Sequence, residues 1–183
     1  SDLKENAMTS PVPPSSDKWL PYRHPMPKES PPELVVPNVI PQDERVWVPT
    51  DDNVWFRPLC MVASRGYWVN LLRVRRAGVV SRHRHPQPVH GYVLKGEWRY
   101  LEHDWVAREG GYVYEAPGET HTLVVDPHAG EMITLFQVNG AMIYCDPDGT
   151  CTGFDDVFTR IDRCRRHYIA NGLGEGFIDQ FIR

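Results

Sequence analysis

Three histidines of this chain have the residue type and the spacing of a metal site. His83 and His85 form a His-x-His pair, and His121 follows much later, after a Pro-Gly turn. Side chains alternate between the two faces of a strand, so a His-x-His pair on a strand places both imidazoles on one face. A third imidazole delivered from a distant strand would close a facial site. The pattern therefore predicts a metal centre of His83, His85 and His121.

The chemistry of such a centre follows from its ligands. Three neutral imidazoles leave a divalent ion its full charge and up to three open coordination positions. That arrangement suits Fe(II) with a chelating anionic substrate and dioxygen, as in the open facial triads of non-haem oxygenases. It also suits Zn or Ni, and Cu binds imidazole more tightly still. The ligand types alone do not select the metal. An isolated His-x-His pair has an alternative interpretation, namely an exposed edge strand whose histidines bind no metal.

Short strands must position these side chains. Between residues 54 and 144, β-branched and aromatic runs alternate with Gly- and Pro-containing turn signals, which predicts an all-β sandwich or barrel of the jelly-roll kind. Asn139-Gly140 is predicted to form a two-residue hairpin. We expect the barrel to occupy residues 51–150. The expected strands cover 54–57, 67–74, 89–94, 97–101, 112–115, 120–125, 131–138 and 141–144.

The segment before the barrel is rich in proline. Eleven of the seventeen prolines lie before residue 50, and proline removes a backbone donor and fixes φ. Residues 8–50 are therefore predicted to be an extended arm, with short edge strands at 33–36 and 45–48. Residues 1–7 are interpreted as a remnant of cloning, because Met8 reads as a natural start. An arm of this kind suits a crossing onto a partner, and we expect a homo-oligomer (dimer or tetramer).

The last segment, residues 151–183, changes to a helical period. Val157, Ile161 and Tyr168 recur at helical spacing. Asp155-Asp156 is predicted to cap a helix that ends at Asn171-Gly172. We expect this helix to pack on the outside of the barrel.

Composition excludes several classes of function. The net charge is −4 without a stretch dense in Lys and Arg, which argues against nucleic-acid and membrane partners. The sequence has no apolar run long enough for a transmembrane helix and no secretory signal pattern. Its four cysteines form no C-x-x-C pair, so reduced thiols are expected. We expect a cytoplasmic protein.

The glycines and histidines together resemble the two sequence motifs of the cupin superfamily. Gly78 precedes His83 and His85, and the Pro-Gly turn precedes His121. The resemblance covers roughly residues 78–125 and implies a single-domain, all-β cupin barrel with a metal in its lumen. In one respect the chain departs from the family, because His90 stands where the usual glutamate ligand is expected. We therefore expect a three-histidine site, with His90 either a fourth ligand or, as we favour, a residue that hydrogen-bonds a ligand, the substrate or bound oxygen.

Aromatic residues on the barrel strands are candidates for a substrate pocket. Tyr92, Trp98 and Tyr114 would form a site for a flat aromatic substrate if they face the lumen, although packing in the core is the alternative. A hydroxyl such as that of Tyr100 could orient a substrate carbonyl. Glu115 could accept a proton or bind a phenol hydroxyl, and solvent exposure of this side chain is equally compatible with the sequence.

Taken whole, the chain resembles the 2,4'-dihydroxyacetophenone dioxygenases, which are single-domain bacterial cupins. The proline-rich arm, the tryptophan-rich first strands and the C-terminal helix add to the resemblance. It implies an Fe(2+) enzyme that uses O2 to cleave the aliphatic C–C bond of a small aromatic hydroxyketone, giving 4-hydroxybenzoate and formate. The alternative is a Zn-binding cupin sensor, or a cupin isomerase or decarboxylase.

Overall fold

The computed structural model describes residue 11 and residues 19–183, so the proposed cloning remnant at 1–7 lies outside it. The chain divides into two units, Ser1–Pro32 and Glu33–Arg183. The described residues of the first unit form neither helix nor strand. They contain one turn in which the Ser30 N–H donates to the Pro27 carbonyl oxygen. The second unit contains all the strands and helices of the described chain.

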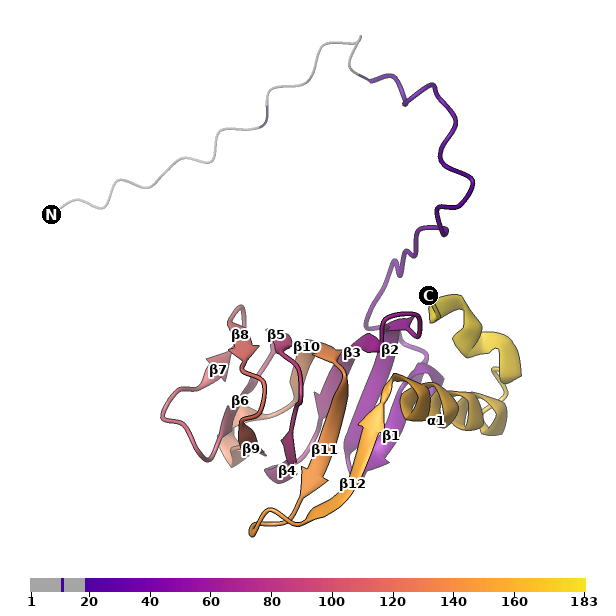
Figure 1. The fold of residues 1–183 in the computed structure, drawn as a ribbon. Coiled ribbons are helices and arrows are strands. Elements are labelled where there is room, and N and C mark those ends of the chain that lie inside the picture. The colour runs from indigo at the N-terminus through magenta and orange to yellow at the C-terminus, as the bar shows by residue number, and fades with distance from the viewer. Residues whose placement is uncertain (1–10, 12–18) are drawn as a thin grey trace, which may run out of the picture. The chain divides into compact units, whose positions relative to one another are not determined.

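The second unit is built from two antiparallel six-stranded sheets that face each other (Figure 1). The first sheet has the strand order β1-β2-β3-β10-β5-β8, and the second has the order β12-β11-β4-β9-β6-β7. This arrangement confirms the predicted all-β jelly-roll barrel. The strands of the first sheet are β1 (Val48–Asp51), β2 (Val54–Val62), β3 (Tyr67–Val74), β10 (Met132–Asn139), β5 (Val89–Lys95) and β8 (Tyr112–Glu115). Those of the second are β12 (Cys151–Asp156), β11 (Ala141–Cys145), β4 (Gly78–Arg84), β9 (Thr120–Val125), β6 (Glu97–Tyr100) and β7 (Ala107–Arg108).

Two details of the barrel differ from the sequence expectations. Strand β12 pairs with β11, so the second sheet continues to Asp156, past the boundary expected at residue 150. The Asn139-Gly140 pair does not form a hairpin, because β10 and β11 belong to different sheets. Gly140 instead turns the chain from one sheet to the other with φ 78°, and its N–H donates to the Gly66 carbonyl oxygen at 3.0 Å.

The edge strands expected in the proline-rich segment are also corrected. Residues 33–36 are not a strand, since prolines on both sides limit the backbone donors available for pairing. The first half of the second expected strand, 45–48, lies instead in the 3-10 helix η2 (Glu44–Val46). The Asp43 carboxylate accepts a hydrogen bond from the Arg45 N–H at 3.0 Å and so caps this short helix. Strand pairing begins only at Val48.

Residues 33–47, at the start of the second unit, cover the outer face of the first sheet. Trp47 is 1% exposed and packs in a cluster with Leu71 and Ile133, and Val36 and Phe177 lie against the same cluster. The Arg73 guanidinium lies 4.1 Å from the centre of the Trp47 ring. This cover lies over β2, β3 and β10, so the inner face of the sheet remains free to line the lumen.

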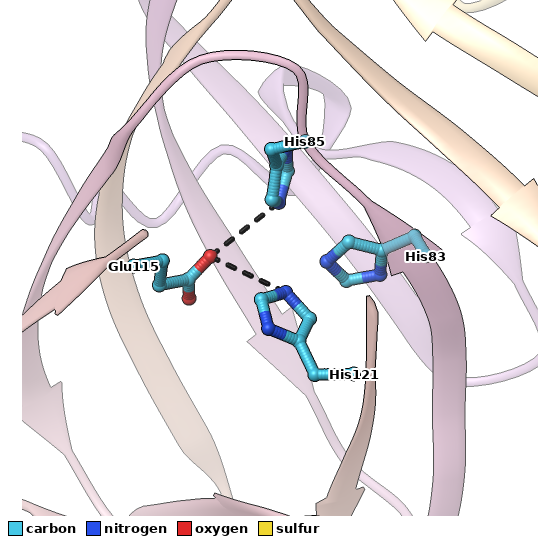
Figure 2. A group of neighbouring side chains, drawn as sticks. All are labelled: His83, His85, Glu115 and His121. Atoms are coloured by element: carbon cyan, nitrogen blue, oxygen red, sulfur yellow. Dashed lines mark ion pairs between the residues drawn. The ribbon is translucent and has the colours of Figure 1, made fainter. Parts of the chain in front are cut away.

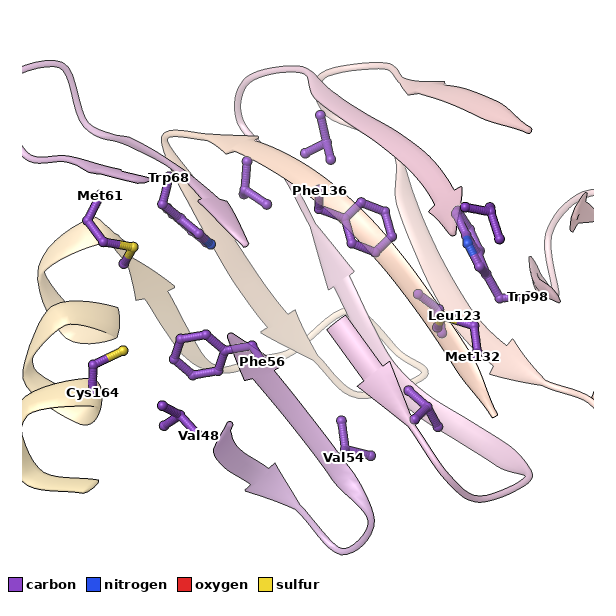
Figure 3. Packing of buried hydrophobic residues seen from close by; sticks show 14 of the residues in the cluster. Val48, Val54, Phe56, Met61, Trp68, Trp98, Leu123, Met132, Phe136 and Cys164 are labelled. Carbon is purple, nitrogen blue, oxygen red and sulfur yellow. The ribbon is translucent and has the colours of Figure 1, made fainter. Parts of the chain in front are cut away.

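One α-helix, α1 (Val157–Ala170), closes the barrel beside β1 and β2 (Figure 1). The Asp156 carboxylate accepts hydrogen bonds from the N–H groups of Phe158 and Thr159, both at 2.9 Å. The predicted cap and the predicted end near Asn171 are confirmed. Figure 3 shows Cys164 of this helix among core residues such as Phe56 and Met61. Two further 3-10 helices are η3 (Pro127–Ala129) and η4 (Glu175–Phe181).

No helix in residues 19–183 is long and apolar enough to cross a membrane.

Gly96 gives a test of how closely the chain packs where β5 ends beside the start of its neighbour β10. It connects β5 to β6 with φ 69°, and a Cβ there would lie 2.3 Å from the Glu131 carbonyl oxygen. Gly110 has a similar φ of 81°, but nothing lies within 4 Å of its Cβ position. Gly110→Ala should therefore lower the free energy of unfolding only by the cost of a left-handed backbone, about 1–2 kcal/mol. Gly96→Ala should lower it further, because its Cβ also meets the Glu131 carbonyl oxygen. Urea denaturation of both variants measures the difference, and equal losses would contradict this packing.

Candidate metal centre

The second sheet and one strand of the first bring four potential ligands together. His83 lies on β4, His85 directly after it, and His121 on β9, where it pairs directly with His83. Glu115 is the last residue of β8 and pairs with Val89 of β5. All four side chains are buried, and Figure 2 shows them pointing toward one another. The three histidines expected to meet do so, and the structure adds Glu115 to them.

The spacing of the ligand atoms fits a single metal ion. All four lie within 4.8 Å of one another. Oε2 of Glu115 is 3.4 Å from Nε2 of His85 and 3.6 Å from Nε2 of His121. Ligands about 2.0–2.2 Å from a tetrahedral ion are separated from each other by about 3.3–3.6 Å. The two measured separations lie in or close to that range.

The buried polar atoms also fit a metal. Oε2 of Glu115 and Nε2 of His121 are buried without a hydrogen-bond partner in the described structure. A buried unpaired carboxylate oxygen is costly, and a cation placed among these atoms would satisfy both. Burial, together with the neighbouring His85 and His121, lowers the pKa of His83 well below its ordinary value. Burial likewise lowers the pKa of His121. Neutral imidazoles with free lone pairs are the form that binds a metal.

Contacts around the cluster fix the orientation of the imidazoles. Nδ1 of His85 lies 2.9 Å from the Ala141 carbonyl oxygen. A carbonyl can only accept, so Nδ1 carries the proton and the Nε2 lone pair points to the cluster. Nδ1 of His83 lies 2.9 Å from the Ser81 hydroxyl. The ring of Tyr100 stacks on His121 with centroids 3.8 Å apart and 7° between the planes.

Tyr100 also orients the carboxylate. Its hydroxyl donates a hydrogen bond to Oε1 of Glu115, which leaves Oε2 turned toward the histidines. Burial, and then the Glu115 carboxylate, raise the pKa of Tyr100 well above its ordinary value. The hydroxyl therefore keeps its proton. Tyr100 thus acts on the cluster through Glu115 and His121.

Tyr100→Phe is expected to weaken metal binding while leaving the four candidate ligands in place. Partners that orient metal ligands typically contribute about 10- to 100-fold in affinity, so we expect a loss of that size in a competition titration with a chelator. Tyr112→Phe is the matched control, because the Tyr112 hydroxyl bonds the outward-facing His90 instead. An unchanged affinity in Tyr100→Phe would show that its hydrogen bond does not support the centre.

The cluster opens onto a cavity of about 400 Å³ inside the barrel. His83, His85, Glu115 and Tyr100 contribute to its wall. The apolar part of the wall comes from both sheets and consists of Val54, Phe56, Leu72, Val80, Val89, Leu123, Phe136, Val138 and Met142. This volume is at the small end of the range of about 300–1,000 Å³ found for small-molecule sites.

His90 does not lie at the cluster. It faces outward from β5, opposite Tyr114 of β8, and its Nδ1 lies 2.6 Å from the Tyr112 hydroxyl. The inward positions on the same strand are Val89, Gly91 and Val93. The expected role of His90 as a fourth ligand or as a partner of a ligand or substrate is therefore corrected, because strand alternation places its side chain on the other face.

The expected substrate-pocket residues are placed elsewhere as well. Tyr92 and Tyr114 are 46% and 55% exposed on the outer face of β5 and β8. Trp98 shares the inward face of β6 with Tyr100, as alternation predicts, but it is 1% exposed and packs against Trp105 and Phe136 in the core. None of these three lines the cavity. Trp98 therefore packs in the core, which was the alternative to a role in the substrate pocket.

The structure adds lining residues that the sequence analysis did not assign to a site. Tyr144 of β11, Asp155 of β12 and Arg160 of α1 all line the cavity. A signal for Arg160 was present in the helical period, since the buried face of α1 consists of Val157, Arg160, Cys164 and Tyr168. A charged residue on an otherwise apolar stripe marks either a buried ion pair or a site.

Comparisons with known proteins agree with the fold. The family model of the ChrR cupin-like domain matches residues 36–142. An RmlC-like cupin protein from Ralstonia eutropha JMP134 is 30% identical with a TM-score of 0.65, covering 74% of this chain and 90% of that one. A cupin-like protein of unknown function from the same organism is 24% identical with a TM-score of 0.63, covering 66% and 75%.

A more distant solved structure is an acetylacetone dioxygenase from Acinetobacter johnsonii. It is 13% identical with a TM-score of 0.61, and the match covers 74% of this chain and 95% of that one. At this identity the likeness concerns the fold. Comparison with curated proteins gave no match. The family model spans more than half of the chain, and its fold and histidine cluster agree with that match: the chain belongs to the cupin superfamily, in the family of ChrR cupin-like domains.

Proposed function

We propose that this protein is an Fe(II)-dependent dioxygenase that cleaves the aliphatic C–C bond of an aromatic 2-hydroxyketone such as 2,4'-dihydroxyacetophenone. The observation that carries the proposal is the cluster of His83, His85, His121 and Glu115, which opens onto a cavity of small-molecule size inside the barrel. The dioxygenase named for acetylacetone among the structural neighbours has the same fold. The resemblance to the dihydroxyacetophenone dioxygenases supplies the substrate.

The residues around the cavity suit this reaction. A divalent iron held by the cluster would supply Lewis acidity and the one-electron chemistry that O2 requires. The Tyr100 hydroxyl donates its proton to a hydrogen bond with Oε1 of Glu115 and so leaves Oε2 for the metal. Leu123, Phe136 and Val138 give the cavity an apolar wall, which excludes water from the reacting atoms.

The overall reaction balances without a further reductant. The hydroxyketone and O2 contain all the atoms of 4-hydroxybenzoic acid and formic acid, and cleavage leaves one atom of O2 in each product. Protein loaded anaerobically with Fe(II) should therefore consume O2 when 2,4'-dihydroxyacetophenone is added. With ¹⁸O2, one labelled oxygen should appear in 4-hydroxybenzoate and one in formate. Label in only one product, or none, would contradict a dioxygenase.

The alternative function is a zinc-binding cupin sensor. Glu115 is the observation that favours it, because four protein ligands complete a tetrahedral zinc site, as in structural centres. The two functions differ in metal content and in oxygen uptake. Protein prepared without added metal that holds stoichiometric zinc, and that consumes no O2 with any 2-hydroxyacetophenone after iron loading, would support the sensor and overturn the dioxygenase.

A further inference from the structure

A second polar cluster lines the cavity beside the metal ligands. It is formed by Tyr144, Asp155 and Arg160, from β11, β12 and α1. The Tyr144 hydroxyl donates to Oδ2 of Asp155 at 2.7 Å, and Nη2 of Arg160 lies 3.2 Å from the same oxygen. Nη2 also donates to the Tyr144 hydroxyl oxygen at 3.1 Å. The three side chains hold one another in place.

Both carboxylate oxygens of Asp155 already have partners in the protein. Its Oδ1 accepts from the Thr159 hydroxyl at 2.8 Å and lies 3.8 Å from the Arg163 guanidinium. One carboxylate therefore faces two guanidinium groups, which leaves this part of the cavity wall with a net positive charge. A charge excess inside a buried cavity favours a ligand with an acidic oxygen.

Arg160 has donors that the protein does not use. Its side chain is only 7% exposed, and every hydrogen bond recorded for it goes through Nη2, to Met142 and Tyr144. Its Nε is buried without a partner, and the guanidinium carbon lies 4.6 Å from the centre of the Phe56 ring. Both edges through which a guanidinium binds a carboxylate with two nitrogens include Nη2, and Nη2 is already occupied by Met142 and Tyr144, so bidentate binding is not available. Nη1 makes no hydrogen bond within the described residues, so this single nitrogen, with its two N–H groups, remains to bind one acceptor oxygen.

The position of this cluster relative to the metal ligands sets the length of the ligand. Tyr144 pairs with His83 across β11 and β4, and their ring centroids are 6.4 Å apart. Asp155 lies on β12, one strand beyond Tyr144, so its backbone lies about two strand spacings, or ~10 Å, from that of His83. Asp51 and Thr152, the exposed residues of the lining, mark where the cavity meets solvent.

We infer that Arg160 is a specificity-determining residue that binds a ring hydroxyl, as phenol or phenolate, at the end of the substrate remote from the metal. The inference rests on the proposed function and narrows its substrate class to aromatic ketones with an acidic oxygen on the ring. Tyr144 and Asp155 are positioning residues that hold the guanidinium. Phe56, which lies under the guanidinium and lines the cavity, provides an apolar contact for the ring.

Binding of two ketones that lack the 2-hydroxyl tests this role without turnover. Zinc-loaded protein is titrated calorimetrically with 4-hydroxyacetophenone and with acetophenone. Hydrogen bonds to charged groups contribute enough free energy for at least about tenfold in affinity, so wild-type protein should prefer 4-hydroxyacetophenone by that factor. Arg160→Met should lower the ratio of the two dissociation constants to about one. Arg166→Met, on the exposed face of the same helix, is the matched control and should keep the wild-type ratio.

Each other outcome is decisive. A wild-type ratio near one, a preference that survives Arg160→Met, or tighter binding of 4-acetylbenzoate than of 4-hydroxyacetophenone would overturn the inference. If Arg160→Met does not fold because Asp155 loses its partner, Asp155→Asn/Arg160→Met removes both charges and gives the same readout. The binding measurement on zinc-loaded protein does not require turnover. If the protein discriminates between the two ketones but consumes no O2, only the proposed dioxygenase function is refuted. If the protein cleaves hydroxyketones but does not discriminate between 4-hydroxyacetophenone and acetophenone, only the role of Arg160 is refuted.

Discussion

His121→Ala is expected to abolish stoichiometric metal binding. His121 supplies a buried nitrogen without any other partner, and it lies between Tyr100, which stacks on it, and Glu115. Loss of a residue that merely orients a ligand weakens binding by about 10- to 100-fold, so loss of the ligand itself should exceed that. Metal analysis after dialysis against a weak chelator should find about one ion per wild-type chain and almost none in the variant.

His90→Ala is the control for His121→Ala. It removes an imidazole from the same barrel, but from the outer face of β5, where the partner of that imidazole is Tyr112. Metal content should remain as in the wild type. Circular dichroism establishes that both variants fold. Full metal content in folded His121→Ala, or metal loss in His90→Ala, would assign the centre to other residues.

Glu115→Gln is expected to change stability in opposite directions with and without metal. In metal-free protein the Glu115 carboxylate is buried with one oxygen unpaired, which is destabilising. Glutamine has nearly the same shape, removes the charge and retains an acceptor for Tyr100, so the metal-free variant should melt at a higher temperature than metal-free wild type. Metal that binds only the folded state stabilises it by RT ln(1 + [metal]/Kd). Added metal should therefore raise the melting temperature of the wild type strongly and that of the variant far less.

Melting curves of both proteins, recorded with a chelator and with excess metal, give the four values required. Asp126→Asn is a suitable control, since Asp126 is an acidic residue paired with Arg99 away from the cluster. It should leave the metal-induced shift unchanged. An equal shift in Glu115→Gln and wild type would show that Glu115 is not a ligand, and the centre would then consist of the three histidines alone.

The histidine ligands could be predicted because their arrangement depends on local geometry. His83 and His85 follow strand alternation, and both are buried while Arg84 between them is exposed. Glu115 could not be assigned to the metal in the same way. Its place depends on the pairing of β8 with β5, which sets Glu115 opposite Val89. That register is a long-range property, and a shift of one residue would have turned Glu115 outward and Tyr114 inward.

The cavity illustrates a second limit of the sequence. Tyr92 and Tyr114 are residue types that are common in substrate pockets. Whether they face the lumen or the outside, however, depends on the register of three strands. Arg160 reaches the lumen only because α1 closes the barrel with its Val157–Tyr168 face turned inward. The cap at Asp156 and the helical period were visible in the sequence, whereas the cavity beneath that face depends on how helix and sheets pack.

The central claim is that one metal ion lies among His83, His85, His121 and Glu115. Anomalous diffraction from crystals of metal-loaded protein, recorded on both sides of the absorption edge of the bound metal, tests it most directly. We predict a single anomalous peak, about 2.0–2.2 Å from one nitrogen of each histidine and from an oxygen of Glu115. A loaded crystal with no peak at this position, or with its peak at another site, would contradict the account.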